Sequence, residues 1–418
     1  MAQIIRRDLY LLRLIDRREN GMIKVITGIR RCGKSYLLFR LYYNYLIDAG
    51  VDPSRIITIS LDDDAYAHLR DHSALSAYIK QQVSNDGTWY IFLDEVQMCQ
   101  GFEGVLNGLN RQENLDIYVT GSNSKFLSSD ILTEFRGRGD EVRIYPLSFS
   151  EYLSAYNGDR YEAWSDYCMY GGLPLILSRK TDEMKAGYLS SLCSELYLKD
   201  LSERHGLRGD NVMPQLLNVL ASDIGSLTNP TRLANTFEST GLSVSSKTLG
   251  LYIDYLMDAF FICRAKRYDI KGKKYIESPY KYYFTDVGLR NVQLNFRQYE
   301  ENHIMENIIY NELLIRGFNV DVGIVEYSAR NKDGKLARNN LEVDFVCNQG
   351  SRRYYIQSAF SIPDKEKMLQ EQNSLTRIRD SFKKIILVRE PTKPWHNEYG
   401  ILIMNVLDFL LNQNSLEL

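Results

Sequence analysis

The residues with the clearest chemical potential form an octapeptide near the N-terminus. It reads GIRRCGKS and fits the pattern G-x-x-x-x-G-K-[ST] in full. A strand-like run (22–27, MIKVIT) precedes it and a helical run (35–46, SYLLFRLYYNYL) follows it. In such a loop, successive backbone N–H groups point at phosphate oxygens, and the helix N-terminus adds positive potential. The predicted nucleotide-binding residues are Gly28, Ile29, Arg30, Arg31, Cys32, Gly33, Lys34 and Ser35.

Two acidic residues follow a second apolar run, 89–93 (WYIFL), and they complete a site for a nucleotide and a metal ion. In a parallel sheet, Asp94 and Glu95 would lie at the carboxyl edge, where α/β proteins bind ligands. Lys34 would neutralise the β- and γ-phosphates, while Ser35 and Asp94 would hold Mg²⁺. Glu95 would orient the attacking water. The sequence therefore predicts binding of ATP with Mg²⁺, and hydrolysis of that ATP.

Residues after a further strand-like run, 116–120 (DIYVT), supply more candidate catalytic groups. Ser122 or Asn123 is predicted to reach the γ-phosphate or the attacking water, and the alternative is a simple turn. Arg136 and Arg138 are candidates for an arginine that stabilises the transferred phosphoryl group, often from a neighbouring subunit. The alternative is that both are solvated loop arginines.

The bulk properties describe a multidomain protein without an overall charge bias. The chain has 418 residues, 25% of them charged, and a net charge of −2, so attraction to nucleic acid would need a local basic patch. No apolar run approaches the length of a membrane span. Its six cysteines are scattered without close pairs, which fits a reducing compartment and predicts a cytoplasmic protein.

The first third of the chain alternates short β-rich runs with helical stretches. Several of these runs are apolar at consecutive positions, as in strands that helices cover on both faces. The alternation predicts an α/β fold with a parallel sheet and right-handed crossovers. The predicted strands are 22–27, 56–61, 89–93 and 116–120.

Several segments together resemble the AAA-type P-loop ATPases of bacteria and archaea. They are GIRRCGKS, IFLDEVQ, VTGSNS, RGRGDEVRIYPLSFSEYL, YGGLP, the pair Lys199-Asp200, and a weaker C-terminal stretch from EN through EVDF to YIQ. The resemblance covers nearly the whole chain. It implies a P-loop ATPase core (1–147), a helical lid (148–206), a winged-helix-like domain (207–292) and a restriction-endonuclease-like α/β domain (293–418).

In nucleases of the last type, the positions of Glu306, Asp344 and Gln357 bind a divalent metal, and a lysine two residues later assists. Here that later position is Ala359, and Gln357 is neutral. An amide is a poorer Mg²⁺ ligand than a carboxylate, and the missing lysine removes the charge that activates water. We therefore expect a degenerate nuclease site without cleavage, with an ATP-driven nuclease as the alternative.

The middle of the chain contains a helix-turn-helix pattern. Helices are predicted over 231–239 and 247–257, joined by a glycine-containing turn. A basic stretch with interleaved tyrosines follows, as a wing that touches DNA would require. Helix pairs of this kind also serve as packing or protein-contact modules. The basic residues are Arg264, Lys266, Arg267, Lys271, Lys273 and Lys274.

Taken together, these features predict an AAA-type ATPase whose nucleotide state controls its appended domains. Two classes of partner remain open. The chain could act on DNA through its middle domain, or it could be a nucleotide-switched signalling or scaffold protein that binds proteins. An arginine acting in trans would also require a homo-oligomer.

Overall fold

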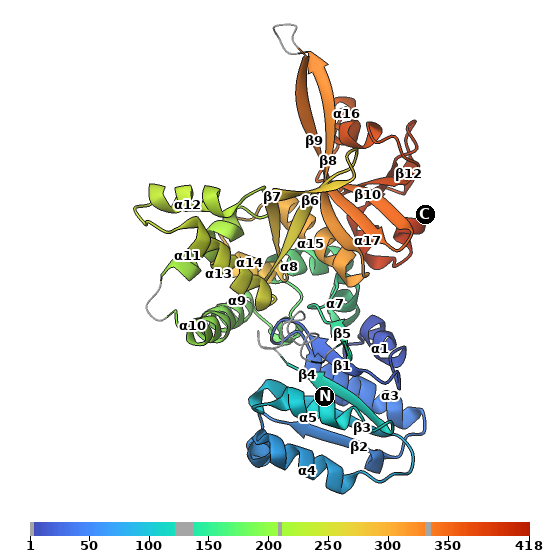
Figure 1. The fold of residues 1–418 in the computed structure, drawn as a ribbon. Coiled ribbons are helices and arrows are strands. Elements are labelled where there is room, and N and C mark those ends of the chain that lie inside the picture. The colour runs from blue at the N-terminus through green and yellow to red at the C-terminus, as the bar shows by residue number, and fades with distance from the viewer. Residues whose placement is uncertain (1–3, 122–134, 136, 208–210, 331–335) are drawn as a thin grey trace. The chain divides into compact units, whose positions relative to one another are not determined.

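In the computed structural model, described residues are 4–121, 135, 137–207, 211–330 and 336–418 (Figure 1). The chain divides into two compact units. The first comprises Met1–Leu147 with Leu173–Leu175 and Asp258–Phe260, and the second comprises the remaining residues. Each unit has its own sheet, so each is described by itself.

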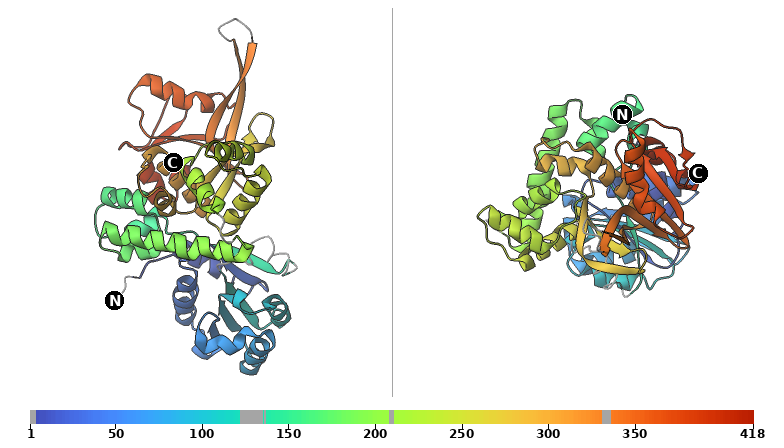
Figure 2. Two further views of the ribbon diagram at one scale, coloured as in Figure 1. Left: turned by 90° about the vertical axis from the view of Figure 1, so that its left-hand side faces the viewer. Right: turned by 90° about the horizontal axis from the view of Figure 1, so that it is seen from above.

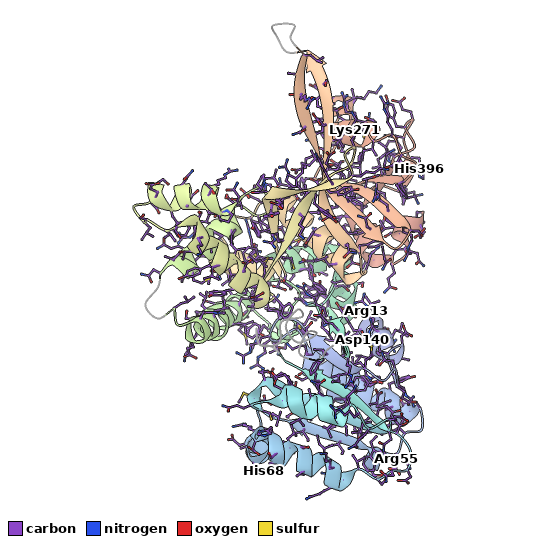
Figure 3. The ribbon with its side chains drawn as sticks, viewed as in Figure 1. Arg13, Arg55, His68, Asp140, Lys271 and His396 are labelled. Atoms are coloured by element: carbon purple, nitrogen blue, oxygen red, sulfur yellow. The ribbon has the colours of Figure 1, made fainter. Side chains whose placement is uncertain are left out.

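The first unit is built on a five-stranded sheet. Its strands are β1 (Ile23–Thr27), β2 (Ile56–Ser60), β3 (Trp89–Asp94), β4 (Leu115–Thr120) and β5 (Gly139–Arg143). Its helices are α1 (Asp8–Ile15), α2 (Lys34–Tyr36), α3 (Tyr43–Asp48), α4 (His72–Gln82) and α5 (Phe102–Leu109). A π-helical segment, Leu37–Tyr42, joins α2 to α3, and short 3₁₀ turns lie at Pro53–Arg55, Asp64–Arg70 and Val96–Met98. Figure 3 labels Arg55 and His68 in these turns.

All neighbouring strands in this sheet run parallel, in the order β2-β3-β4-β1-β5. The prediction of an α/β fold with a parallel sheet is confirmed. Because β4 lies between β3 and β1, the carboxyl ends of these three strands meet at one edge. The residues that end β1, β3 and β4 therefore lie close together in space, although they are far apart in the sequence.

Helices cover both faces of the sheet, which explains the consecutive apolar residues in its strands. On one face, Ile91 and Val119 belong to a buried cluster with Leu75 of α4 and Leu106 of α5. On the other face, aromatic rings meet: Tyr42 lies 4.9 Å from Tyr118 and 5.8 Å from Phe92 between ring centroids. The helical segment that follows the glycine-rich loop is thus anchored on the centre of the sheet.

One buried ion pair ties two central strands together. Lys24 on β1 donates to Asp116 on β4, and both side chains are almost fully buried. Tyr118 donates to the same carboxylate across 2.8 Å, and Tyr42 lies 2.5 Å from the Tyr118 hydroxyl oxygen. Breaking such a buried pair by removing one partner typically costs about 3–5 kcal/mol. The network links the helical segment that follows the glycine-rich loop to β1 and β4.

The second unit contains helices and an eight-stranded sheet. Its helices are α7 (Phe149–Ala155), α8 (Arg160–Tyr170), α9 (Asp182–Ser191), α10 (Lys199–His205), α11 (Val212–Ser222), α12 (Pro230–Ser239), α13 (Ser246–Asp258), α14 (Val287–Gln293), α15 (Glu301–Ile315), α16 (Lys365–Thr376) and α17 (Val406–Leu411). A π-helical segment, Leu192–Leu198, joins α9 to α10, and 3₁₀ turns occur at Pro174–Ser178 and Ser415–Glu417. The strands are β6 (Ile262–Asp269), β7 (Lys274–Phe284), β8 (Asn319–Arg330), β9 (Leu336–Gln349), β10 (Arg352–Ala359), β11 (Lys383–Val388), β12 (Trp395–His396) and β13 (Leu402–Asn405).

The sheet order is β12-β13-β11-β10-β9-β8-β6-β7, and the long β8–β9 hairpin projects from it (Figures 1 and 2). The β6–β7 hairpin pairs with β8 through Arg267–Asp269. The predicted domain boundary at residue 292 therefore runs through one hydrogen-bonded sheet. The finer division of residues 148–418 into a lid, a winged-helix-like domain and a nuclease-like domain stays a prediction.

The two predicted helices of the middle segment are present as α12 and α13, and local capping explains where they begin. The Asn229 side chain accepts the Arg232 N–H across 2.7 Å, and Pro230 occupies the first helical position. The Ser245 hydroxyl accepts the Thr248 N–H across 3.0 Å. The basic stretch that follows forms β6, β7 and their turn, where Figure 3 labels Lys271.

Candidate nucleotide site

The glycine-rich loop follows β1 directly, and its glycines are required by close approach and backbone conformation. Gly28 has φ 138°, and a Cβ there would lie 2.2 Å from the carbonyl oxygen of Ile144. Gly33 has φ 101° and precedes the first residue of α2. Side chains at these positions would push the loop away from the sheet edge or strain it. The sequence pattern thus has a direct steric cause.

Lys34 points back into the loop that it terminates. Its side chain is buried, and its ammonium donates to the carbonyl oxygens of Gly28 across 2.9 Å and Ile29 across 3.2 Å. Both of these acceptors are neutral carbonyl groups. The loop therefore presents one concentrated cation together with the N-terminus of a helix, an arrangement suited to phosphate groups.

Asp94 ends β3 beside two hydroxyl groups from neighbouring segments. Thr120, the last residue of β4, donates its hydroxyl hydrogen to Asp94, and Ser35 of the loop also hydrogen-bonds to this carboxylate. Burial raises the pKa of Asp94, and these two hydrogen bonds oppose the rise. A carboxylate and a serine hydroxyl held together next to Lys34 are oxygen ligands of the kind that Mg²⁺ prefers.

Glu95 adopts an unusual backbone conformation, with φ 49° and ψ 45°. A non-glycine residue in the left-handed region is uncommon, and such outliers concentrate at functional sites. Its backbone N–H donates to the Thr120 hydroxyl oxygen across 3.4 Å, and Gln97 donates its amide to the Glu95 carboxylate. Thr120 thus touches both acidic residues.

Thr120 and Gln97 were not singled out from the sequence. The signal for Thr120 was its position as the last residue of a predicted strand next to the loop. The residues expected to act there, Ser122 and Asn123, lie outside the described residues, as does Arg136. Arg138 is described: its side chain is exposed, and its carbonyl oxygen accepts the Ile23 N–H across 2.8 Å at the start of β1.

Arg7 is a further residue that the sequence pattern did not reveal. Its guanidinium donates to the carbonyl oxygens of Cys32 across 3.0 Å and Tyr145 across 2.7 Å, and it lies 4.6 Å from the centroid of the Tyr10 ring. The side chain is buried. A residue just before α1 therefore holds the loop from outside the motif.

Two further basic residues, Arg13 in α1 and Arg17 just after it, make contacts within the first unit. Arg17 donates to Asp140 on β5 across 2.9 Å. Figure 3 labels Asp140 and Arg13 within this unit. The Arg13 guanidinium lies 5.3 Å from the centroid of the Tyr10 ring. The Arg17 contact therefore joins the segment after α1 to β5, an edge strand of the sheet.

The three residues proposed for a degenerate nuclease site also lie together, in the second unit. Glu306 is on α15, Asp344 on β9 and Gln357 on β10. The Asp344 N–H donates to the Gln357 side-chain oxygen across 3.4 Å. The carboxyl groups of Glu306 and Asp344 both contact Lys281 of β7. Ala359, at the expected lysine position, is buried.

Among the described residues, no group of three or more His, Cys, Asp or Glu side chains is arranged to hold a metal ion. Across that same part of the chain, each helix is too short or too polar to pass through a lipid bilayer.

Comparisons with known proteins bear on both units. Residues 20–153 match the family model described as "AAA domain", and residues 161–300 match a domain of unknown function (DUF8612). An uncharacterized protein of Haemophilus influenzae is 33% identical over 414 residues, covering 98% of this chain and 99% of that protein. An uncharacterized protein of Methanocaldococcus jannaschii is 28% identical over 382 residues, covering 88% of this chain and 80% of that protein.

Among solved structures, a Walker-type ATPase of Pyrococcus abyssi is similar with 18% identity and a TM-score of 0.49, over 70% of this chain and 96% of that one. The match to the Haemophilus influenzae protein, at 33% identity over nearly the full length of both chains, shows that the two proteins are related. The glycine-rich loop, Gly28 to Ser35, lies within the residues that match the AAA family model. The chain belongs to the same family as the Haemophilus influenzae protein, and its residues 20–153 are an AAA domain.

Proposed function

We propose that the first unit binds ATP together with Mg²⁺ and hydrolyses the nucleotide to ADP and phosphate. The observation that carries this proposal is the convergence of Lys34, Asp94 and Thr120 at the carboxyl edge of a parallel sheet. The AAA family match over residues 20–153 supports the same nucleotide chemistry.

Each residue has a role that follows from its charge and position. Lys34 and the loop N–H groups would bind the phosphates, and Ser35 and Asp94 would hold Mg²⁺, which neutralises phosphate charge when it is bound. Glu95 would accept a hydrogen bond from the attacking water and orient it. The Thr120 hydroxyl would hold the Asp94 carboxylate and the Glu95 backbone N–H in fixed positions relative to each other.

The test uses two variants of the full chain with opposite expected effects. Lys34→Ala should weaken ATP binding by about 100-fold, or about 2.7 kcal/mol, because the phosphates lose their main cation. Glu95→Gln should bind ATP nearly normally and hydrolyse it at least about 100-fold more slowly, because the amide orients water poorly.

Both are measured by equilibrium binding of labelled ATP and by phosphate release. Lys80→Ala, which removes an exposed lysine of α4, is the control for a lost positive charge. Normal ATP affinity in Lys34→Ala would refute the assignment of the loop. Normal turnover in Glu95→Gln would assign the water-orienting role to another residue.

The second proposal is that ATP turnover is coupled to a partner of the second unit, and that this partner is DNA. Its support is a basic cluster at the end of the β6–β7 hairpin. Lys271 and Lys273 in the turn and Lys274 at the start of β7 are all exposed, in a chain that is nearly neutral overall. Such a local cluster attracts phosphate backbones in a salt-dependent way. The alternative partner is a protein, reached by a nucleotide-switched scaffold.

Phosphate release with and without duplex DNA separates these alternatives. Stimulation that falls with rising salt, and that is lost when the three lysines are changed to glutamine, supports DNA. The scaffold function is supported if DNA does not change the rate of ATP turnover and a native protein partner is captured from cells in an ATP-dependent way.

A further inference from the structure

The fold gathers the predicted nuclease-like positions into one buried cluster, independently of the nucleotide site. Asp344 and Gln357 lie on adjacent antiparallel strands, β9 and β10, and Glu306 comes from α15. One oxygen of Asp344 accepts the Ser358 N–H across 2.8 Å. The question is whether these oxygens are arranged for a metal ion.

A lysine from another strand lies among them. The ammonium of Lys281, on β7, is 2.7 Å from a Glu342 oxygen, 2.9 Å from a Glu306 oxygen and 3.6 Å from an Asp344 oxygen. Its side chain is only 4% exposed. The same Glu306 oxygen accepts the hydroxyl hydrogen of Tyr283 across 2.6 Å.

Three carboxyl groups surround the ammonium. Those of Glu342 and Glu306 lie within hydrogen-bond distance of it, and that of Asp344, at 3.6 Å, adds an ion pair. Burial works against the charge of Lys281, but the carboxylates of Glu306, Asp344 and Glu342 more than offset it and raise its pKa. The lysine is therefore a permanent cation inside the cluster.

A divalent metal does not fit beside this cation. A Mg²⁺ bound to the Glu306 oxygen at about 2.1 Å would lie within about 5 Å of the ammonium, in a buried site where charge repulsion is poorly screened. The metal would also compete with Lys281 and Tyr283 for the same oxygen lone pairs. Gln357 adds only a neutral amide oxygen, which already accepts a backbone N–H.

We infer that Lys281 takes the place of a divalent cation, so that the Glu306–Glu342–Asp344 cluster binds no Mg²⁺ or Mn²⁺ and cleaves no DNA. The ammonium instead joins β7, β9 and α15 through one buried charge network. The Lys281 ammonium is enclosed by the carboxyl groups of Glu306, Glu342 and Asp344.

The experiment measures Mn²⁺ binding to the nucleotide-free full chain, by calorimetry and by electron paramagnetic resonance. All variants carry Asp94→Asn so that the nucleotide site does not contribute. We expect no Mn²⁺ binding that depends on Asp344 when Lys281 is present. Lys281→Met should create one Mn²⁺ site per chain, and adding Asp344→Asn should abolish it. Lys365→Met, which removes an exposed lysine of α16, should create no site.

Three results would overturn the inference. The first is Mn²⁺ binding by the chain with Lys281 intact that disappears with Asp344→Asn. The second is cleavage of labelled single- or double-stranded DNA by the wild type that disappears in Asp344→Ala. The third is a folded Lys281→Met variant that gains no Mn²⁺ site. Should Lys281→Met fail to fold by circular dichroism, the first two measurements still decide the matter.

Discussion

The guanidinium of Arg7 donates to the carbonyl oxygen of Cys32 across 3.0 Å, so a residue outside the glycine-rich motif holds the loop in place. A second donation, to Tyr145 across 2.7 Å, ties the same guanidinium to the segment after β5. The Arg7 guanidinium thus ties the glycine-rich loop to the segment after β5 before any nucleotide binds. Preorganisation of this kind lowers the cost of binding.

Arg7→Ala should weaken ATP binding about tenfold, or about 1.4 kcal/mol, because the loop loses charged hydrogen bonds and must be ordered by the nucleotide. The measurement is equilibrium binding of labelled ATP, with thermal unfolding to confirm that the variant is folded. Arg6→Ala is the matched control, since Arg6 is exposed and adjacent. Equal affinities for the two variants would show that Arg7 does not position the loop.

Thr120→Val should reduce the rate of hydrolysis more than ATP affinity. Valine keeps the shape of threonine but removes the hydroxyl that joins Asp94 to the Glu95 backbone. We expect kcat to fall by about tenfold to 100-fold while KM changes by less than about threefold, as for a residue that positions catalytic groups. Thr120→Ser, which keeps the hydroxyl, should restore most of the rate. If Thr120→Ser does not restore the rate of hydrolysis, the loss of rate in Thr120→Val results from altered packing and not from the missing hydroxyl group.

If Arg138 acts on the nucleotide of a neighbouring subunit, ATPase activity per chain will rise with protein concentration. Arg138→Ala should remove that rise and leave ATP binding intact, because the side chain is exposed and not part of the loop. Phosphate release over a wide dilution series provides the measurement. Activity per chain that stays constant on dilution would exclude a contribution in trans.

The stability of the second unit should fall as the pH rises from about 4 towards about 7, and level off above it. Burial, and repulsion from Glu306, raise the pKa of Asp344 to about 7, although Lys281 opposes the rise. The folded chain then keeps a proton that the unfolded chain releases near pH 4, so this contribution to stability is present below that pH and is lost as the pH passes 7.

Urea unfolding between pH 5 and 8 checks this expectation. The neighbouring Glu342 carboxylate also raises the pKa of Asp344. Asp344→Asn should flatten the pH dependence, whereas Glu398→Gln, at an exposed site, should leave it unchanged. An unaltered pH profile in Asp344→Asn would show that another group is responsible.

Some of the site could be predicted from sequence because its chemistry is local. The residues from Gly28 to Ser35 are consecutive, and their glycines, lysine and serine follow from the needs of one loop between a strand and a helix. Asp94 could be placed because a carboxylate after an apolar strand must lie at the edge of the sheet. The four predicted strands of the first unit are present as β1 to β4, and the signal for them was equally local: short β-rich runs, several of them apolar at consecutive positions.

Other relationships depended on how distant segments pack. Thr120 looked like an ordinary strand end until β4 was placed between β1 and β3. Arg7 lies 25 residues before its acceptor, Cys32, with no spacing rule that connects them. The pairing of β6 with β8, which places the basic β6–β7 hairpin in the eight-stranded sheet, also joins segments that are distant in the sequence.

By itself, the sequence determined the phosphate-binding loop, the acidic strand end and the parallel α/β architecture of the first unit, because each rests on neighbouring residues or on regular apolar spacing. Only the tertiary structure decided what surrounds the C-terminal carboxylates. The sequence shows alanine at 359, where a lysine was expected, whereas the fold brings Lys281 from 25 residues before Glu306 into contact with it. A buried carboxylate requires a nearby counter-charge, but any strand that packs against it can supply one.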